Sequence, residues 1–257
     1  MSYRTWGEPD HPAMLLLHGF LGATTDWTDL AKALAETFYL VAIDLPGHGK
    51  SQKVLLDGDP VQRTCLMIDD VIAGLGLSRF SVLGYSLGGR IALAYALSRP
   101  ECITRLIIES AHPGLSCEGD RHRRWQSDHA WIQRFMCQPL EQVLDDWYQQ
   151  PVFHDIPAAR RKILVDQRKR QNSAILAKML EAFSLAKQPD YSGRLATAGF
   201  PVHYLAGARD QKFKGVGEQL GRTGCLTRLH TINDCGHNIH REQPLAMAAV
   251  IRDLLDG

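Results

Sequence analysis

Residues 80–90 read Phe-Ser-Val-Leu-Gly-Tyr-Ser-Leu-Gly-Gly-Arg, and this stretch decides how the rest of the chain is interpreted. A short apolar run ends at Gly84, a helical pattern begins at Leu87, and Ser86 is the centre of a Gly-x-Ser-x-Gly pattern. A sharp strand-to-helix turn strains the serine backbone and crowds the positions two before and two after it, where glycine fits because it lacks a Cβ. The stretch predicts a nucleophile elbow, with the Ser86 hydroxyl clear of a sheet at the start of a helix. An ordinary strand-to-helix turn is the alternative.

The overall composition is that of an ordinary globular protein. The 257 residues are 45% hydrophobic and 22% charged, with a net charge of +1, which suits one large α/β domain or two modest ones. This charge gives no reason to expect nucleic acid, and no Lys/Arg-rich block indicates a membrane surface. Six scattered cysteines without a Cys-x-x-Cys pair favour free thiols over disulfides or a zinc site. Because no apolar run has signal-peptide or membrane-span length, we expect a cytoplasmic protein.

Strand and helix patterns alternate on both sides of the central stretch. The predicted strands lie at residues 13–17, 39–43, 81–83, 104–108, 201–206 and 227–232, and the predicted helices at 28–37, 61–77, 87–97 and 244–255. This alternation predicts an α/β fold with a mostly parallel sheet and helices on both faces. The residues before Ala13 leave room for one or two further brief strands.

The pattern changes between residues 113 and 187, which show helical spacing without a strand and are rich in Arg, Gln and Trp. This segment carries 12 Lys and Arg against 9 Asp and Glu. A helical insert more basic than its host suggests a cap over a site for anions, although solvated helix faces would also explain most of these charges. We predict a core of residues 1–112 and 189–257, with a helical cap of residues 113–188 inserted after the sixth strand.

A serine hydroxyl needs an imidazole to remove its proton, and the imidazole needs an orienting carboxylate. Three features, the elbow, the His18-Gly19-Phe20 loop after an early strand and the terminal Gly236-His237, resemble the α/β-hydrolase-fold family over most of the chain. In that family the order along the chain is serine, acid, histidine. Asp210 and His237 both follow strands and fit this order.

The family resemblance also assigns the neighbouring residues. It implies that the Phe20 and Leu87 amides donate to an oxyanion. Glu109 also ends a strand and is the alternative acid. Three further histidines are interpreted as supporting groups rather than as the base; they are His18, His48 and His240.

The cap contains strings that are more particular than the elbow. They are His112-Pro113-Gly114-Leu115, Ser127-Asp128 with Trp131 and Gln133-Arg134-Phe135, Asp146-Trp147-Tyr148-Gln149-Gln150-Pro151-Val152-Phe153 and Met179-Leu180-Glu181-Ala182, and the match extends to Asp210-Gln211-Lys212-Phe213 and Gly236-His237-Asn238-Ile239-His240-Arg241-Glu242. These strings closely resemble the family of 2-succinyl-6-hydroxy-2,4-cyclohexadiene-1-carboxylate synthases, the lyases of menaquinone biosynthesis. The resemblance spans nearly the whole chain.

This second resemblance implies an elimination rather than a hydrolysis. The family removes pyruvate from 2-succinyl-5-enolpyruvyl-6-hydroxy-3-cyclohexene-1-carboxylate, with the triad of Ser86, Asp210 and His237 as the general base. It implies no metal and no organic cofactor. The partner is a small-molecule tricarboxylate, with neither nucleic acid nor membrane, and a monomer is expected.

The three carboxylates of such a substrate suit planar arginine forks. Arg90 lies one helical turn after Ser86, so its side chain can share the serine's face. Two further arginines, Arg124 and Arg168, match the family's cap arginines by their surroundings. The resemblance places Tyr85 and Trp147 in the lining of the pocket.

Several alternatives stay open. Arg90 could be a solvent-exposed helix residue, and the nearby Arg121 or Arg123 could take the role assigned to Arg124. A serine esterase, thioesterase or C–C-bond hydrolase would use the same triad, and only the cap strings favour the lyase. A non-catalytic binding protein usually lacks a triad member, and all three are present here.

Overall fold

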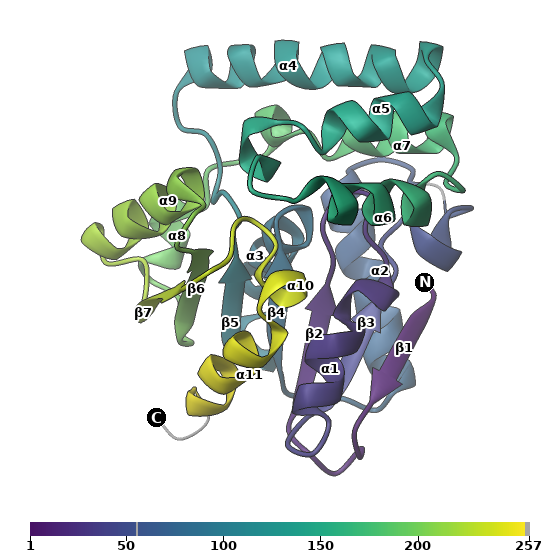
Figure 1. The fold of residues 1–257 in the computed structure, drawn as a ribbon. Coiled ribbons are helices and arrows are strands. Elements are labelled where there is room, and N and C mark those ends of the chain that lie inside the picture. The colour runs from purple at the N-terminus through teal and green to yellow at the C-terminus, as the bar shows by residue number, and fades with distance from the viewer. Residues whose placement is uncertain (55, 255–257) are drawn as a thin grey trace.

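The computed structural model describes residues 1–54 and 56–254, which form one seven-stranded sheet with helices around it (Figure 1). The strands are β1 (Tyr3–Trp6), β2 (Ala13–Leu17), β3 (Tyr39–Ile43), β4 (Phe80–Tyr85), β5 (Ile103–Glu109), β6 (Val202–Gly207) and β7 (Arg228–Ile232). Their order across the sheet is β1-β3-β2-β4-β5-β6-β7. β1 pairs with β3 antiparallel, and every other pairing in this sheet is parallel. The predicted mostly parallel sheet is confirmed.

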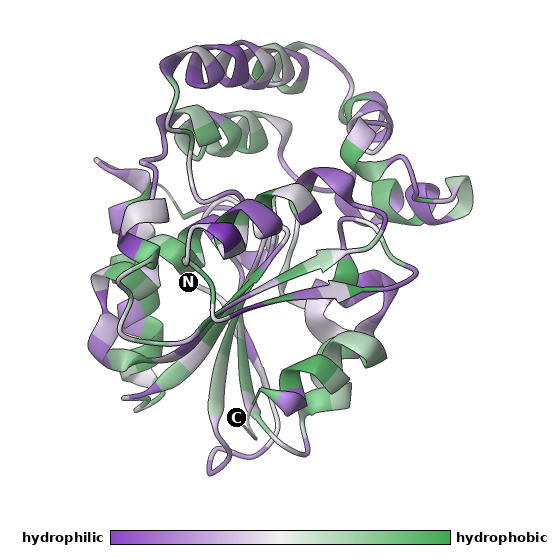
Figure 2. Cartoon of the chain, turned by 90° about the vertical axis from the view of Figure 1, so that its left-hand side faces the viewer, coloured by the Kyte–Doolittle hydropathy of each residue, from purple (hydrophilic) through white to green (hydrophobic). Residues whose placement is uncertain are grey.

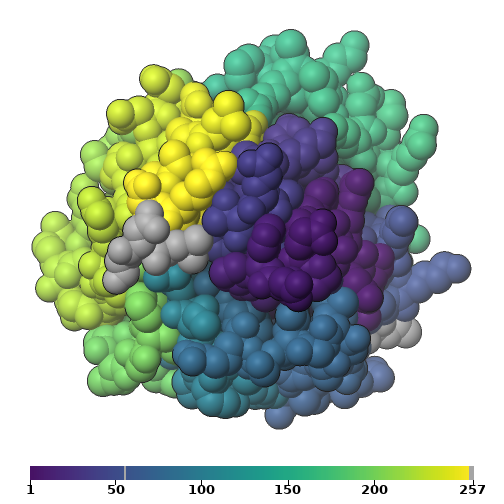
Figure 3. Space-filling model, turned by 90° about the horizontal axis from the view of Figure 1, so that it is seen from below, coloured from purple at the N-terminus to yellow at the C-terminus, as the bar shows by residue number. Residues whose placement is uncertain are grey.

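Helices cover both faces of the sheet. Helices α1 (Thr28–Leu34) and α11 (Pro244–Asp253) pack on one face, and α2 (Pro60–Gly74), α3 (Leu87–Ser98) and α9 (Gln211–Arg222) pack on the other. Leu15 and Leu17 of β2 point to the α2–α3 side, whereas Met14 and Leu16 point to the α1–α11 side. Because both faces are buried, the strand reads as a continuous apolar run. Seen from below, α11 lies beside the N-terminal part of the chain (Figure 3).

The helical insert lies between β5 and the short helix α8 (Ser192–Leu195). Its helices are α4 (Glu118–Cys137), α5 (Leu140–Trp147), α6 (Ala158–Arg168) and α7 (Ser173–Ala182). They form a layer above the sheet (Figure 1) and share a small core of their own, which includes Leu21 from the loop after β2. The outermost helix, α4, is mostly hydrophilic, whereas the strands of the sheet are mostly hydrophobic (Figure 2). The insert therefore covers the edge of the sheet at which β2 ends.

Two details differ from the sequence prediction. The prediction that the insert follows the sixth strand is wrong: it follows β5, the fifth strand, because a single strand precedes Ala13. The predicted helix 244–255 corresponds to α11, which ends at Asp253, and Leu255 lies outside the described residues. The boundaries of the cap at residues 113 and 188 stay a prediction.

Candidate active site

The Gly-x-Ser-x-Gly stretch forms the predicted turn between β4 and α3. Ser86 has φ +49° and ψ −108°, a conformation that an L-residue adopts only where its surroundings enforce it. A Cβ on Gly84 would lie 2.4 Å from the Gly88 carbonyl oxygen, and one on Gly88 would lie 2.0 Å from the Leu17 carbonyl oxygen. Because no side chain fits at either glycine, the sequence pattern is explained by close backbone approach.

The predicted acid and base are bonded to each other. Asp210 follows β6, and its Oδ2 lies 2.7 Å from His237 Nδ1 in the loop after β7. The other carboxylate oxygen, Oδ1, accepts a hydrogen bond from the Phe213 amide at 3.2 Å, which fixes the carboxylate at the start of α9. Both side chains are buried. With Nδ1–H donating to Asp210, His237 presents Nε2 as the atom that can accept a proton.

The elbow places Tyr85, the residue before Ser86, close to the base. The Tyr85 ring lies 5.2 Å from the His237 ring between centroids. The loop after β2 also reaches the elbow, since a Cβ on Gly19 would lie 3.5 Å from Ser86 Cβ. In the described part of the chain, the Ser86 hydroxyl makes no hydrogen bond. Such bonds are often long in ligand-free sites and shorten only with substrate bound.

The alternative acid, Glu109, has a different partner. Its carboxylate oxygens lie 3.0 and 2.8 Å from His240 Nδ1, and one of them also accepts from the His240 amide at 3.1 Å. Both side chains are fully buried, and the His240 ring stacks on Trp27 with centroids 4.1 Å apart. The geometry therefore favours Asp210 as the partner of His237, with Glu109 and His240 supporting the site from behind Tyr85.

The loop after β2 carries the predicted oxyanion donor Phe20, and the other donor, the Leu87 amide, begins α3. The Gly22 amide donates to the Gly19 carbonyl at 2.9 Å, which closes a tight turn around Phe20. Leu21 within this turn has φ +67°, which costs a non-glycine residue about 1–2 kcal/mol.

Two buried histidines shape the loops behind this turn. His18 Nε2 accepts from the Leu45 amide at 3.0 Å, so its Nδ1–H donates to the Gly19 carbonyl at 2.8 Å. His48 Nδ1 lies 2.9 Å from the Pro46 carbonyl oxygen. Burial lowers the pKa of His18, and burial together with the neighbouring His18 lowers the pKa of His48 to about 3. Both rings are therefore neutral near pH 7.

The neutral state of His48 predicts acid sensitivity. The unfolded chain protonates this ring near its ordinary pKa of about 6.5, whereas the folded chain does so only near 3. Between these values the unfolded state binds more protons, so the free energy of unfolding should fall with the pH by about 1.4 kcal/mol per unit from His48 alone. Urea unfolding at several pH values below about 6.5 measures this slope. In a His48→Asn variant this slope should be shallower by about 1.4 kcal/mol per pH unit, which corresponds to one bound proton. An unchanged slope would contradict this account.

Aromatic side chains close the site from above. Trp147 of α5 packs against Phe20 with ring centroids 5.1 Å apart, and Trp131 of α4 packs against Trp147 at 5.0 Å. Phe153 lies 5.6 Å from the His237 ring. Tyr85 is buried below, and burial raises its pKa well above 10. Of the two predicted lining residues, Tyr85 thus lies against His237 and Trp147 against Phe20, and their role in the pocket stays a prediction.

Arg90 is not a free surface residue. Its Nη2 donates to the Phe183 carbonyl at 2.8 Å and its Nη1 to Gln188 Oε1 at 3.2 Å, both in the chain that leaves the insert. Burial lowers the pKa of Arg90 to about 9, and the nearby Arg124 adds to this. The guanidinium therefore joins α3 to the end of the insert through neutral partners.

Arg124 and Arg168 have acidic partners of their own. Arg124 Nε lies 2.9 Å from both oxygens of the buried Asp128, which also accepts from Ser184. Among the described residues, the two terminal nitrogens of Arg124 have no hydrogen-bond partner. Arg168 Nη2 lies 2.6 Å from both oxygens of Asp26. Arg168 is therefore already paired with a carboxylate of the protein, and its role as a ligand of a substrate carboxylate stays a prediction.

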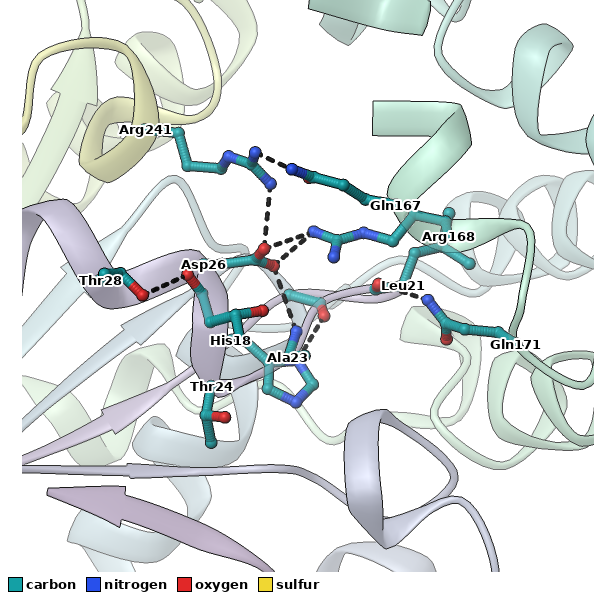
Figure 4. A network of polar contacts seen from close by, with 12 residues as sticks. His18, Leu21, Ala23, Thr24, Asp26, Thr28, Gln167, Arg168, Gln171 and Arg241 are labelled. Carbon is teal, nitrogen blue, oxygen red and sulfur yellow. Dashed lines mark hydrogen bonds and ion pairs between the residues drawn. The ribbon is translucent and has the colours of Figure 1, made fainter. Parts of the chain in front are cut away.

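Asp26 is the centre of a buried network (Figure 4). It bonds Arg168 of α6 and, at 3.0 Å, Arg241 of the short helix α10 (Ile239–Glu242). Burial alone would raise the pKa of Asp26, but Arg168 and Arg241 more than offset this and hold the pKa below its ordinary value. The network joins the insert, the loop after β2 and the segment after His237.

Lys212 is a cation that the sequence analysis did not single out. It lies on the first turn of α9, two residues after Asp210, with Nζ 5.3 Å from the Phe213 ring centroid. That ring lies 4.7 Å from the His237 ring. Lys212 is an exposed residue, but partial desolvation of its ammonium lowers the pKa of Lys212, and Arg124 lowers it further. No hydrogen bond or ion pair to Lys212 occurs in the described part of the chain. The sequence signal that could have identified Lys212 as a site residue was its position two residues after the predicted acid, Asp210.

A strained serine stands between β4 and α3, and an Asp–His pair follows the parallel strands β6 and β7. This arrangement defines a protein of the α/β-hydrolase fold. A sequence model of the alpha/beta hydrolase fold family matches residues 12–244. A 2-succinyl-6-hydroxy-2,4-cyclohexadiene-1-carboxylate synthase from Enterobacter sp. (strain 638) is 39% identical over 97% of this chain and 93% of its own length. One from Klebsiella pneumoniae subsp. pneumoniae is 40% identical over 97% and 96%. The chain belongs to the 2-succinyl-6-hydroxy-2,4-cyclohexadiene-1-carboxylate synthase family.

Solved structures agree with this assignment. MenH from S. aureus superposes with a TM-score of 0.90 and 26% sequence identity, covering 99% of this chain and 97% of that one. A thermophilic esterase from Thermogutta terrifontis gives a TM-score of 0.82 at 21% identity, covering 99% and 92%, and shows the shared fold alone. Among the described helices, none has both the length and the apolar composition needed to span a membrane.

Proposed function

We propose that this chain is a carbon–oxygen lyase that eliminates pyruvate from 2-succinyl-5-enolpyruvyl-6-hydroxy-3-cyclohexene-1-carboxylate and leaves 2-succinyl-6-hydroxy-2,4-cyclohexadiene-1-carboxylate. The observation that carries the proposal is a bonded Asp210–His237 pair whose imidazole lies close to Tyr85 of the elbow, in a chain about 40% identical to such synthases over nearly its full length. The reaction belongs to menaquinone biosynthesis.

The proposed chemistry begins with proton removal from carbon. His237 takes the proton of the Ser86 hydroxyl, and the serine oxygen takes the proton of the ring carbon that bears the succinyl ketone. The ring double bond shifts as the C–O bond to the enolpyruvyl group breaks. The enolate that leaves is protonated on carbon and becomes pyruvate, with protonated His237 as the source of that proton.

Two further groups of residues would serve the same step. Negative charge develops on the ketone oxygen, where the Phe20 and Leu87 amides can stabilise it, and losing one such donor typically costs ~10²–10³ in rate. The three carboxylates require cations. Arg124 and Lys212 suit this role: Arg124 pairs with Asp128 through Nε alone, and its two terminal nitrogens and the Lys212 ammonium have no hydrogen-bond partner among the described residues. Arg90 adds a partly buried positive charge one turn from the serine.

Arg124 offers a direct test of carboxylate binding. Arg124→Ala should raise KM by roughly 10-fold or more with little change in kcat, because a hydrogen-bonded ion pair to the substrate contributes about 1.5–3 kcal/mol. Steady-state pyruvate release measures both constants. Arg123→Ala is the matched control, since that side chain is exposed on the same helix and pairs with Asp120. A large fall in kcat at constant KM would contradict a binding role.

Esterase or thioesterase activity is the competing function, because the triad alone fits both. Purified protein should release pyruvate from the enolpyruvyl substrate much faster than it cleaves short acyl esters. Rapid ester cleavage without pyruvate release would overturn the lyase proposal.

We also propose that the protein acts as a monomer in the cytoplasm without a nucleic-acid partner. The net charge of +1 and the six free cysteines support this. Light scattering after gel filtration tests the oligomeric state, and a stable dimer would contradict it.

A further inference from the structure

The loop that carries Phe20 holds a conformation that it does not favour by itself. Leu21 has φ +67° although it is not glycine, and such a residue persists only where its surroundings determine it. From below, His18 Nδ1–H holds the Gly19 carbonyl at 2.8 Å. Downstream, the Thr24 amide donates to Asp44 at 2.7 Å. These core contacts fix the two ends of the turn, while Leu21 lies between them.

The insert holds the middle of the turn. Gln171, between α6 and α7, donates from Nε2 to the Leu21 carbonyl at 2.8 Å (Figure 4). Because the acceptor is a carbonyl, the amide nitrogen must face it. Gln171 Oε1 is buried and has no partner among the described residues, so this one bond orients the side chain. The Leu21 side chain is itself fully buried in the core of the insert.

The same insert anchors the end of the loop. Asp26 Oδ2 accepts from the Ala23 amide at 3.2 Å, and both Asp26 oxygens are held by Arg168 of α6. Arg241, four residues after His237, bonds the same carboxylate. Two side chains of the insert therefore act on one segment of the core, residues 20–26, and that segment contains the Phe20 amide assigned to the oxyanion.

We propose that Gln171 is a positioning residue for the reaction: by holding the Leu21 carbonyl, it aims the Phe20 amide at the developing oxyanion. The inference rests on the proposed function, in which that amide acts in the transition state. It makes the insert part of the catalytic geometry of the core, in addition to any contact with substrate. A donor displaced by a fraction of an ångström loses much of its effect on the transition state.

Gln171→Glu tests the proposal because it keeps the shape of the side chain and replaces the donor with an oxygen that repels the Leu21 carbonyl. The expected result is a fall in kcat of about 10-fold or more, with KM close to that of wild type, because the lost interaction acts only in the transition state. Gln133→Glu is the matched control: that residue is exposed on α4, and its one side-chain hydrogen bond among the described residues is to His129 of its own helix. The control should keep wild-type kcat and KM.

Amide hydrogen exchange gives a readout that needs no substrate. Exchange in residues 19–24 should be faster in Gln171→Glu than in wild type or Gln133→Glu, at an unchanged midpoint of thermal unfolding. If wild type releases no pyruvate, the proposed function fails, and the exchange rates alone decide whether Gln171 holds the loop. Wild-type kcat in Gln171→Glu, or exchange equal to that of the control, would overturn the inference.

Discussion

Replacing Ser86 with alanine should lower kcat for pyruvate release by at least ~10³-fold, and His237→Ala should do the same. The reason is that the hydroxyl and the imidazole act as one proton relay, so losing either member removes the whole effect. For the same reason, the double variant should be no slower than the slower single variant. Steady-state pyruvate release measures kcat for the two single variants and the double variant. Thermal unfolding checks that each variant is folded.

Two outcomes would contradict this relay. Retained turnover in Ser86→Ala would mean that another group removes the proton. Losses that multiply in the double variant would mean that the two residues act independently. Glu109→Gln provides a useful comparison, because Glu109 bonds His240 rather than His237, and its loss should leave the pH dependence of kcat in place.

Asp26→Asn should cause the largest loss of stability of any single polar substitution considered for this chain, about 3–5 kcal/mol in the free energy of unfolding. The change keeps the size of the side chain but removes the charge that faces two guanidinium groups. Arg168 and Arg241 are only 7% and 17% exposed in their side chains, so water cannot replace the lost partner. Urea unfolding at neutral pH measures the loss.

The control for this prediction is an ion pair at the surface. Asp166→Asn removes the partner of Lys169 on the exposed side of α6, and such pairs contribute little because solvent screens them. Equal stability of Asp26→Asn and wild type would show that the buried network is not a stabilising link between the insert and the core.

The parts of the site that were predictable from sequence depend on local chain geometry. The elbow glycines had to be glycines because backbone atoms lie within 2.4 Å of where a Cβ would be. Asp210 and His237 follow consecutive parallel strands, and such strands end at one edge of the sheet. The hydrogen bond between them was therefore implied by strand order, although 27 positions separate them.

The parts that were not predictable depend on contacts between distant segments. Arg168 and Asp26 lie 142 positions apart, and nothing in either local pattern shows that they pair. The positive φ of Leu21 is likewise hidden, because a leucine gives no sign of a left-handed conformation. The number of strands before the insert was predicted one too high, because the residues before Ala13 leave room for two brief strands but form only β1. The residues of β1 are mostly exposed, so they show no buried pattern from which strands could be counted.

The most direct test of the account follows both products in one reaction. Wild-type protein should release pyruvate and form the conjugated diene in equal amounts from the enolpyruvyl substrate, and Ser86→Ala should form both at least ~10³-fold more slowly. Pyruvate without diene, or equal rates in the two proteins, would contradict elimination by the Ser86–His237–Asp210 relay.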